Sequence, residues 1–248
     1  MTVLLSAQGI SKRFGDRVVL QDIGFDVEDG EVHGIMGPNG AGKTTCFHVL
    51  TGRYKPDGGK VSFRGLDVTG MAPHAIARLG IARSFQVMNL FDDYTALDNA
   101  LIATPEFRAR GFDFFGDAAN ATAARERAAR TLADVGLAGK ESTRARELSY
   151  GDRRALEIGV ALAADPRLIF LDEPTAGLGA EGLARIAALI DEIRRRITLV
   201  VIEHDMRFLF GVADRISVVH WGQVIARGTP ADLRSNPWVQ RSNLGGLA

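Results

Sequence analysis

Residues 37–45 of the 248-residue sequence have the types and spacing of a phosphate-binding loop. Glycines let the backbone turn tightly around phosphate oxygens, and a helix that follows directs its partially positive amino end at the same anion. Lys43 is placed to reach the β- and γ-phosphates of a nucleotide, and the Thr44 hydroxyl to bind a magnesium ion. The candidate nucleotide-binding residues of this loop are Gly37, Pro38, Asn39, Gly40, Ala41, Gly42, Lys43, Thr44 and Thr45.

The sequence around this loop distinguishes it from a chance glycine-rich turn. Residues 31–36 have the pattern of a strand, and residues 46–50 have that of the start of a helix. A phosphate-binding loop requires this order of strand, loop and helix.

A second candidate site follows residues 168–171, an apolar stretch typical of a buried strand. Asp172 and Glu173 come directly after it, at the carboxyl edge where ligands of α/β sheets bind. We expect Asp172 to hold magnesium, and Glu173 to orient and polarise a water that attacks the γ-phosphate. The alternative is that both acids only begin the next helix, and the upstream phosphate loop favours catalysis.

Three other places have two interpretations each. His204, after another apolar run, either contacts the γ-phosphate or is a structural or surface group. Phe14, in a turn before the phosphate loop, either packs in the core or stacks on a nucleotide base. Ser149 and Gly151 open a helix that either binds an anion at its amino end or is simply capped there.

Composition limits the classes of protein to consider. The formal net charge is +0 and 46% of the residues are hydrophobic, which indicates a globular protein and gives no sign of a nucleic-acid binder. Cys46, the single cysteine, is expected to be a small core residue. We expect no signal peptide, and the apolar runs are shorter than the roughly 20 residues that cross a bilayer.

The pattern of strands and helices predicts an α/β fold with an insertion. Residues 4–27 look like antiparallel strands, whereas residues 96–164 are rich in Ala, Arg and Glu with helical periodicity. Beyond residue 166 strands and helices alternate, which implies a mainly parallel sheet. We expect a core with an antiparallel β-subdomain at 1–95 and 165–248, an inserted α-helical subdomain at 96–164, and Gln86 at the end of a strand over 80–86.

In order and spacing, these motifs resemble the ATP-binding subunits of ABC transporters over nearly the whole chain. The resemblance rests on the phosphate loop, Gln86 after Arg-Ser-Phe, Leu-Ser-Tyr-Gly, Leu-Asp-Glu-Pro and Glu-His-Asp. Gly-Ile-Ala-Arg-Ser-Phe-Gln, Leu-Ser-Tyr-Gly-Asp and Val-Ile-Glu-His-Asp-Met look like the branched-chain amino acid importer group. The fold implied is the P-loop NTPase core of an ABC ATPase, which binds ATP and Mg²⁺.

The resemblance implies a role for each candidate residue. Phe14 stacks on adenine, and His204 is the γ-phosphate switch that acts with Glu173 and Lys43 in catalysis. Gln86 binds magnesium together with Thr44 and Asp172, and links the nucleotide to the membrane subunits. Ser149 and Gly151 contact the ATP held by a second ATP-binding subunit, because family members enclose two ATP molecules in a head-to-tail dimer.

The resemblance also implies partners and leaves alternatives. The partners are a second ATP-binding subunit, transmembrane permeases and, indirectly, a periplasmic binding protein, with the chain on the cytoplasmic face of the bacterial inner membrane. The cargo implied is a branched-chain or other small amino acid, or urea or an amide. The alternatives are an exporter motor, such as one for lipopolysaccharide, and a soluble ABC protein of translation or DNA repair.

Two positions depart from the family pattern. Asp152 stands where glutamine or glutamate is commoner in the superfamily, although aspartate occurs in the resembled group. Gly179 stands where many relatives carry aspartate or asparagine, in the loop that crosses the dimer interface. We expect little effect from Asp152, and fewer polar contacts between sites from Gly179.

Overall fold

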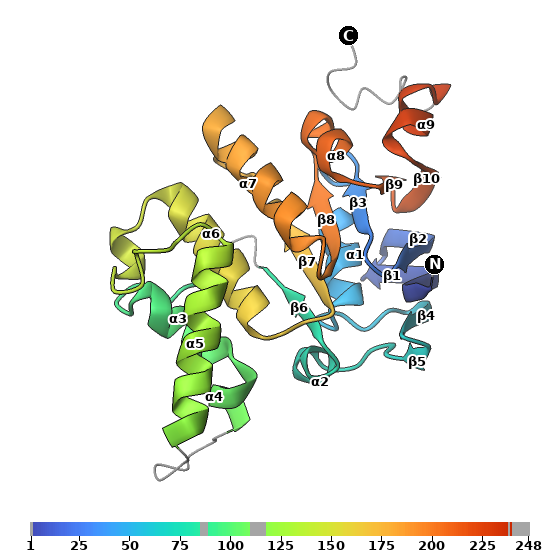
Figure 1. Cartoon of the computed structure of the whole chain (residues 1–248). Helices are drawn as coiled ribbons and strands as arrows, with labels where there is room; N and C mark the ends of the chain where they lie inside the picture. The colour runs from blue at the N-terminus through green and yellow to red at the C-terminus, as the bar shows by residue number, and fades with distance from the viewer. Residues whose placement is uncertain (1, 85–88, 110–117, 238, 240–248) are drawn as a thin grey trace.

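The computed structural model describes residues 2–84, 89–109, 118–237 and 239, and its strands form two sheets (Figure 1). The first sheet is antiparallel, with the order β2-β1-β4-β5. Its strands are β1 (Val3–Phe14), β2 (Arg17–Glu28), β4 (Gly58–Phe63) and β5 (Leu66–Asp67). The turn between β1 and β2 contains Gly15 at φ +58°, so the end of β1 presents Phe14 beside a tight turn.

The second sheet has the order β10-β9-β3-β8-β7-β6 and is parallel except for β10. Its strands are β3 (Val32–Met36), β6 (Ile81–Arg83), β7 (Leu168–Asp172), β8 (Thr198–Glu203), β9 (Arg215–His220) and β10 (Gln223–Gly228). Every residue of β3, β7 and β8 is buried, as expected of central parallel strands covered on both faces. The carboxyl ends of β3, β7 and β8 therefore meet at one edge.

Apolar side chains of this sheet alternate between two cores. On β7, Leu168 and Phe170 pack with α1 (Lys43–Leu50) and the antiparallel sheet, whereas Ile169 and Leu171 face the opposite core. This is the two-residue period of a strand. The opposite core is built with α7 (Ala180–Ile193) and α8 (Met206–Val212), and the remaining short helices outside the insertion are α2 (Pro73–Arg78) and α9 (Pro230–Arg234).

The described elements between residues 96 and 163 are helices that pack on one another (Figure 1, green to yellow). They are α3 (Ala96–Ala103), α4 (Pro105–Ala109), α5 (Ala118–Asp134), the 3₁₀ turn η1 (Ala145–Glu147) and α6 (Tyr150–Ala163). Thr95 and Asp98 form a capping box that begins α3. The predicted fold class, an α/β core with an antiparallel sheet and a helical insertion, is confirmed.

One predicted element boundary was wrong. The strand expected at residues 80–86 covers only Ile81–Arg83, and Gln86 lies outside the described residues. The backbone N–H of Ser84 still donates to Phe170 O at 2.8 Å, so pairing with β7 continues one residue beyond β6.

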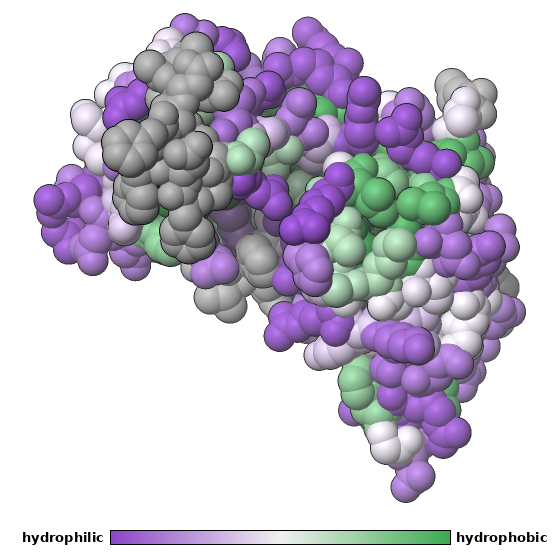
Figure 2. Space-filling model, turned by 90° about the horizontal axis from the view of Figure 1, so that it is seen from below, coloured by the Kyte–Doolittle hydropathy of each residue, from purple (hydrophilic) through white to green (hydrophobic). Residues whose placement is uncertain are grey.

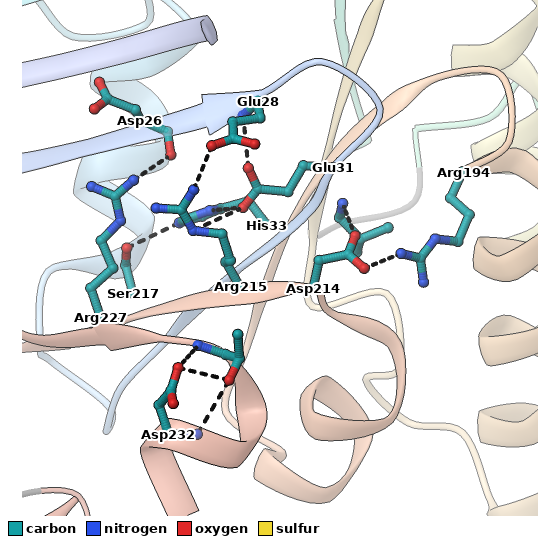
Figure 3. Close-up of polar contacts among 12 residues, drawn as sticks. Asp26, Glu28, Glu31, His33, Arg194, Asp214, Arg215, Ser217, Arg227 and Asp232 are labelled. Carbon is teal, nitrogen blue, oxygen red and sulfur yellow. Dashed lines mark hydrogen bonds and ion pairs between the residues drawn. The ribbon is translucent and has the colours of Figure 1, made fainter. Parts of the chain in front are cut away.

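A buried polar network joins the two sheets (Figure 3). His33 on β3 bridges Glu31 and Ser217, with ring-nitrogen distances of 2.8 and 3.0 Å. Arg215 on β9 pairs with Glu28 at the end of β2 at 2.8 Å. The antiparallel sheet is thus tied by charged and hydrogen-bonded groups to the amino-terminal ends of β3 and β9, away from the phosphate loop that follows the carboxyl end of β3.

The surface seen from below is mainly hydrophilic, with its largest group of hydrophobic residues to the right of centre and smaller groups elsewhere (Figure 2). Among the described residues, no helix combines the length and apolarity needed to cross a membrane.

Candidate functional site

The phosphate loop leads from the carboxyl end of β3 into α1, as predicted. Gly40 and Gly42 adopt left-handed φ values of +79° and +104°, which side chains rarely allow. Gly37 is needed for a different reason, because a Cβ there would lie 2.1 Å from Val219 O of the β9–β10 hairpin. The same hairpin donates from Gly222 N to Ala41 O at 2.9 Å and so supports the loop from outside.

Lys43 is buried within this loop, and its Nζ donates to Gly37 O at 2.7 Å and Pro38 O at 3.1 Å. Burial lowers the pKa of Lys43, although the nearby carboxylates of Glu173 and Asp172 oppose the shift. Helix α1 begins without a side-chain cap. An uncapped helix start beside an ammonium group suits the binding of an anion.

The two acids follow β7, at the edge of the sheet that carries the phosphate loop. Asp172 is 2% exposed, and burial, followed by the neighbouring charge of Glu173, raises its pKa to about 6. Glu173 adopts φ +47°, a strained conformation for a residue with a side chain. Its side chain remains 19% exposed, so its carboxylate is open to the site whereas Asp172 lies deeper.

His204 follows β8, the strand next to β7, and its side chain is 55% exposed. Its Nδ1 lies 3.6 Å from Oε1 of Glu173. Asp205, the next residue, caps α8 by accepting a hydrogen bond from Phe208 N at 3.1 Å. The imidazole is therefore held at the mouth of the site between a strand end and a capped helix.

Glu203 is a third acid at this edge, and the sequence motifs alone had assigned it no role. Its side chain is fully buried and accepts hydrogen bonds from Thr175 N at 3.0 Å, from the Thr175 hydroxyl and from His204 N at 3.1 Å. In the sequence, its position directly after the apolar run 197–202 could have identified it as a site residue. Glu203 therefore connects the end of β8, directly before His204, to the loop after β7.

A cavity of about 340 Å³ opens over the phosphate loop. Phe14 is 44% exposed at its edge and makes an edge-on contact with Tyr54, at a centroid distance of 5.2 Å. Arg17 and Val19 also line it, and nothing in the sequence had marked these two positions. The lining residues are Phe14, Arg17, Val19, Asn39, Gly40, Gly42, Lys43, Thr44, Thr45 and Glu173.

The residues at this cavity fit ATP and magnesium. The glycine conformations, the uncapped helix start and Lys43 suit a chain of phosphates. The described residues contain no group of three or more His, Cys, Asp or Glu that could hold a metal. The Thr44 hydroxyl at the cavity and the Asp172 carboxylate at the end of β7 are hard oxygen donors of the kind that magnesium prefers.

Ser149 and Gly151 lie at the start of α6 and are not among the residues lining the cavity. Ser149 is the N-cap of α6 and accepts from Asp152 N at 3.2 Å. A Cβ at Gly151 would meet no atom within 4 Å, so space is open there. The structure therefore brings together Lys43, Glu173 and His204, and leaves the α6 start apart from the cavity lining of this one chain.

Comparisons with known proteins fit this geometry. A family model described as "ABC transporter" matches residues 20–176. The chain is 38% identical to the high-affinity branched-chain amino acid transport ATP-binding protein LivG of Salmonella typhimurium and 37% identical to BraF of Pseudomonas aeruginosa, with 98% of each chain covered. It is 34% identical to the lipopolysaccharide export ATP-binding protein LptB of Acidithiobacillus ferridurans, covering 99% of this chain and 98% of LptB.

Solved structures of ATP-binding cassettes superpose on this chain. The ADP conformation of MJ1267, an ATP-binding cassette of an ABC transporter, superposes with a TM-score of 0.86 and 30% identity over 99% of this chain and 100% of MJ1267. A dimeric, post-hydrolysis structure of the cassette MJ0796 bound to ADP and Pi gives a TM-score of 0.76 and 25% identity over 92% and 99%.

Proposed function

The chain belongs to the ABC transporter family, and from this premise we propose that it is the ATP-hydrolysing subunit of an importer for branched-chain or related small amino acids. The observation that carries the proposal is the convergence of Lys43, Glu173 and His204 at one sheet edge around the phosphate loop. The identities of 38% and 37% to LivG and BraF support this cargo class. Urea and amides are related cargoes.

The site residues divide the work of hydrolysis. Lys43 exchanges the carbonyls of Gly37 and Pro38 for phosphate oxygens, and the first turn of α1 binds the same charge. Bound magnesium would neutralise developing negative charge on the phosphates, held by Thr44 and Asp172. Glu173 accepts a proton from the attacking water, and His204 contacts the γ-phosphate beside it.

Two copies, or this chain and a paralogue, are proposed to close over two ATP molecules. Support comes from Ser149 and Gly151, whose open helix start has no place in the cavity of its own chain. The related cassette MJ0796 is dimeric in its ADP- and Pi-bound structure. Nucleotide then stabilises the closed pair through its greater affinity for that state.

A groove of about 340 Å³ between α2, β6 and α6 is proposed to dock a transmembrane permease. Apolar and small side chains from both parts of the fold line it, among them Ala77 on α2 and Val160 on α6. Arg83 and Asn89, on either side of Gln86 in the sequence, also line it. A permease docked there would hold the chain at the cytoplasmic face of the inner membrane, and a periplasmic binding protein would deliver the cargo.

Lipopolysaccharide export is the second candidate, because LptB is 34% identical over nearly the full chain. The test is reconstitution of the chain with the permeases encoded beside it in proteoliposomes, with leucine, valine, isoleucine, urea and lipopolysaccharide as cargoes. We expect ATP-dependent uptake of an amino acid. Stimulation by lipopolysaccharide alone would establish the exporter, and failure to associate with any permease would favour a non-transport ABC protein.

The docking groove can be tested separately. Ala77→Glu places a charge at the groove and should release the permease while the isolated chain keeps its ATPase activity. Ala188→Glu, on the exposed side of α7, is the matched control. Equal permease association of both variants would place the permease elsewhere.

A further inference from the structure

The start of α6 holds the loop that carries Glu173. This β7–α7 loop, residues 173–179, joins Asp172 at the end of β7 to α7. Three residues in the first turns of α6, two positions apart in sequence, reach the loop or the helix after it. They are Tyr150, Asp152 and Arg154.

Tyr150 contacts the middle of the loop. Its hydroxyl donates to Ala176 O at 3.0 Å. Gly177 has φ +75°, and a Cβ there would lie 2.9 Å from the Tyr150 hydroxyl oxygen. The loop conformation and the tyrosine therefore fit only with glycine at 177.

Asp152 joins the same helix start to α7. Its Oδ1 accepts from Arg185 Nη1 of α7 at 2.7 Å. Its Oδ2 accepts from Lys140 Nζ at 2.6 Å and from the Ser149 hydroxyl at 2.8 Å. One carboxylate thus holds both α7 and the hydroxyl that is proposed to meet the partner's ATP.

Arg154 reaches Glu173 itself. Its side chain is 2% exposed and pairs with Glu157 at 2.6 Å, and its Nη2 donates to Glu173 O at 3.4 Å. Thr175 is held from the other side by Glu203 of β8. The loop is therefore fixed between α6 and β8, with the Glu173 backbone in its strained φ of +47°.

We propose that Tyr150, Asp152 and Arg154 are positioning residues that connect the segment binding the partner subunit's ATP to the loop carrying Glu173 of the same chain. Binding of Ser149 and Gly151 to one ATP then adjusts the base that acts on the other ATP. The inference rests on the proposed function. The contacts from α6 connect the two sites through a loop in which Gly179 has no side chain to make polar contacts.

The test compares Tyr150→Phe and Arg185→Ala in the full chain with Tyr94→Phe and Arg195→Ala. Tyr94 is 53% exposed and packs on Phe91, and Arg195 pairs with Glu192, so the controls remove the same groups elsewhere. We expect the first two variants to lower kcat for MgATP about two- to tenfold, the effect of one lost hydrogen bond, with KM unchanged. In a Glu173→Gln background, ATP-dependent dimerisation should remain as in Glu173→Gln alone.

If the wild-type chain hydrolyses MgATP and Lys43→Ala does not, the proposed function stands. Two results would then overturn only the further inference. One is an unchanged kcat in both Tyr150→Phe and Arg185→Ala. The other is a change confined to KM, which would make these residues part of ATP binding instead. A wild-type chain that fails to hydrolyse MgATP would overturn the proposed function together with the inference.

Discussion

Nδ1 of His204 lies 3.6 Å from Oε1 of Glu173, although 30 positions separate the two residues in the sequence. They follow neighbouring parallel strands whose register pairs Asp172 with Ile202. Each residue therefore leaves the sheet at nearly the same level, and the register of β7 against β8 sets their distance. The result is a carboxylate and an imidazole side by side at the mouth of the phosphate site.

Glu173→Gln should lower the rate of ATP hydrolysis about 100-fold or more, because the amide cannot accept the proton of the attacking water. ATP binding should persist, since Lys43 and the loop are unchanged, and an ATP-bound dimer should accumulate. Phosphate release and gel filtration with MgATP measure the two effects. Glu181→Gln, an exposed acid in the first turn of α7, is the control, and steady-state turnover equal to wild type in Glu173→Gln would remove the base assignment.

Lys43→Ala should weaken ATP binding about 10- to 100-fold, the range expected for loss of a charge-assisted hydrogen bond. Titration with a fluorescent ATP analogue measures the affinity. Lys60→Ala, on the exposed edge of β4 beside Asp67, removes the same charge outside the site and should bind normally. Equal affinities for the two variants would contradict the role of Lys43.

His33 should make stability fall as the pH drops. Burial lowers the pKa of His33 below its ordinary 6.5, with the hydrogen bond to Glu31 opposing the shift and Arg215 and Arg227 adding to it. The folded state keeps the ring neutral while the unfolded chain takes up a proton, so stability present above pH 6.5 is lost below it. The free energy of unfolding should therefore fall between pH 7.5 and 5.5, by at most about 1.4 kcal/mol per pH unit for one proton.

Urea unfolding at both pH values measures this effect. His33→Gln should flatten the decrease in the free energy of unfolding, whereas His74→Gln, on the exposed surface of α2, should leave it as in wild type. The same pH dependence in His33→Gln and wild type would show that another group is responsible.

Arg154→Ala should lower the free energy of unfolding by about 3–5 kcal/mol, because it leaves Glu157 as a buried charge without this partner. Arg130→Ala breaks an exposed pair with Glu126, 3.7 Å apart on α5. This variant should change the free energy of unfolding by less than about 0.5 kcal/mol. Urea midpoints compare the two. Similar midpoints would mean that the buried pair adds no more than a surface pair.

Local pattern was sufficient for much of the fold and for several site residues. Strand, glycine loop and helix are adjacent in sequence, so residues 31–50 could be placed before the structure was known. Asp172 and Glu173 could be placed at a sheet edge because an apolar strand must be buried and its polar end must leave the core. The end of the strand before Gln86 could not be placed from local composition, because β6 ends at Arg83 although its hydrogen bonding to β7 continues through Ser84.

The sequence by itself determined which groups are the candidates for holding phosphate and activating water, because their order and spacing are local properties of the chain. Only the tertiary structure decided that Glu203 is buried against Thr175 and that Tyr150 reaches Ala176. It also decided that Ser149 lies outside the lining of its own chain's cavity. These contacts join residues distant in sequence, and sheet register and helix packing set their distances, which no local pattern encodes.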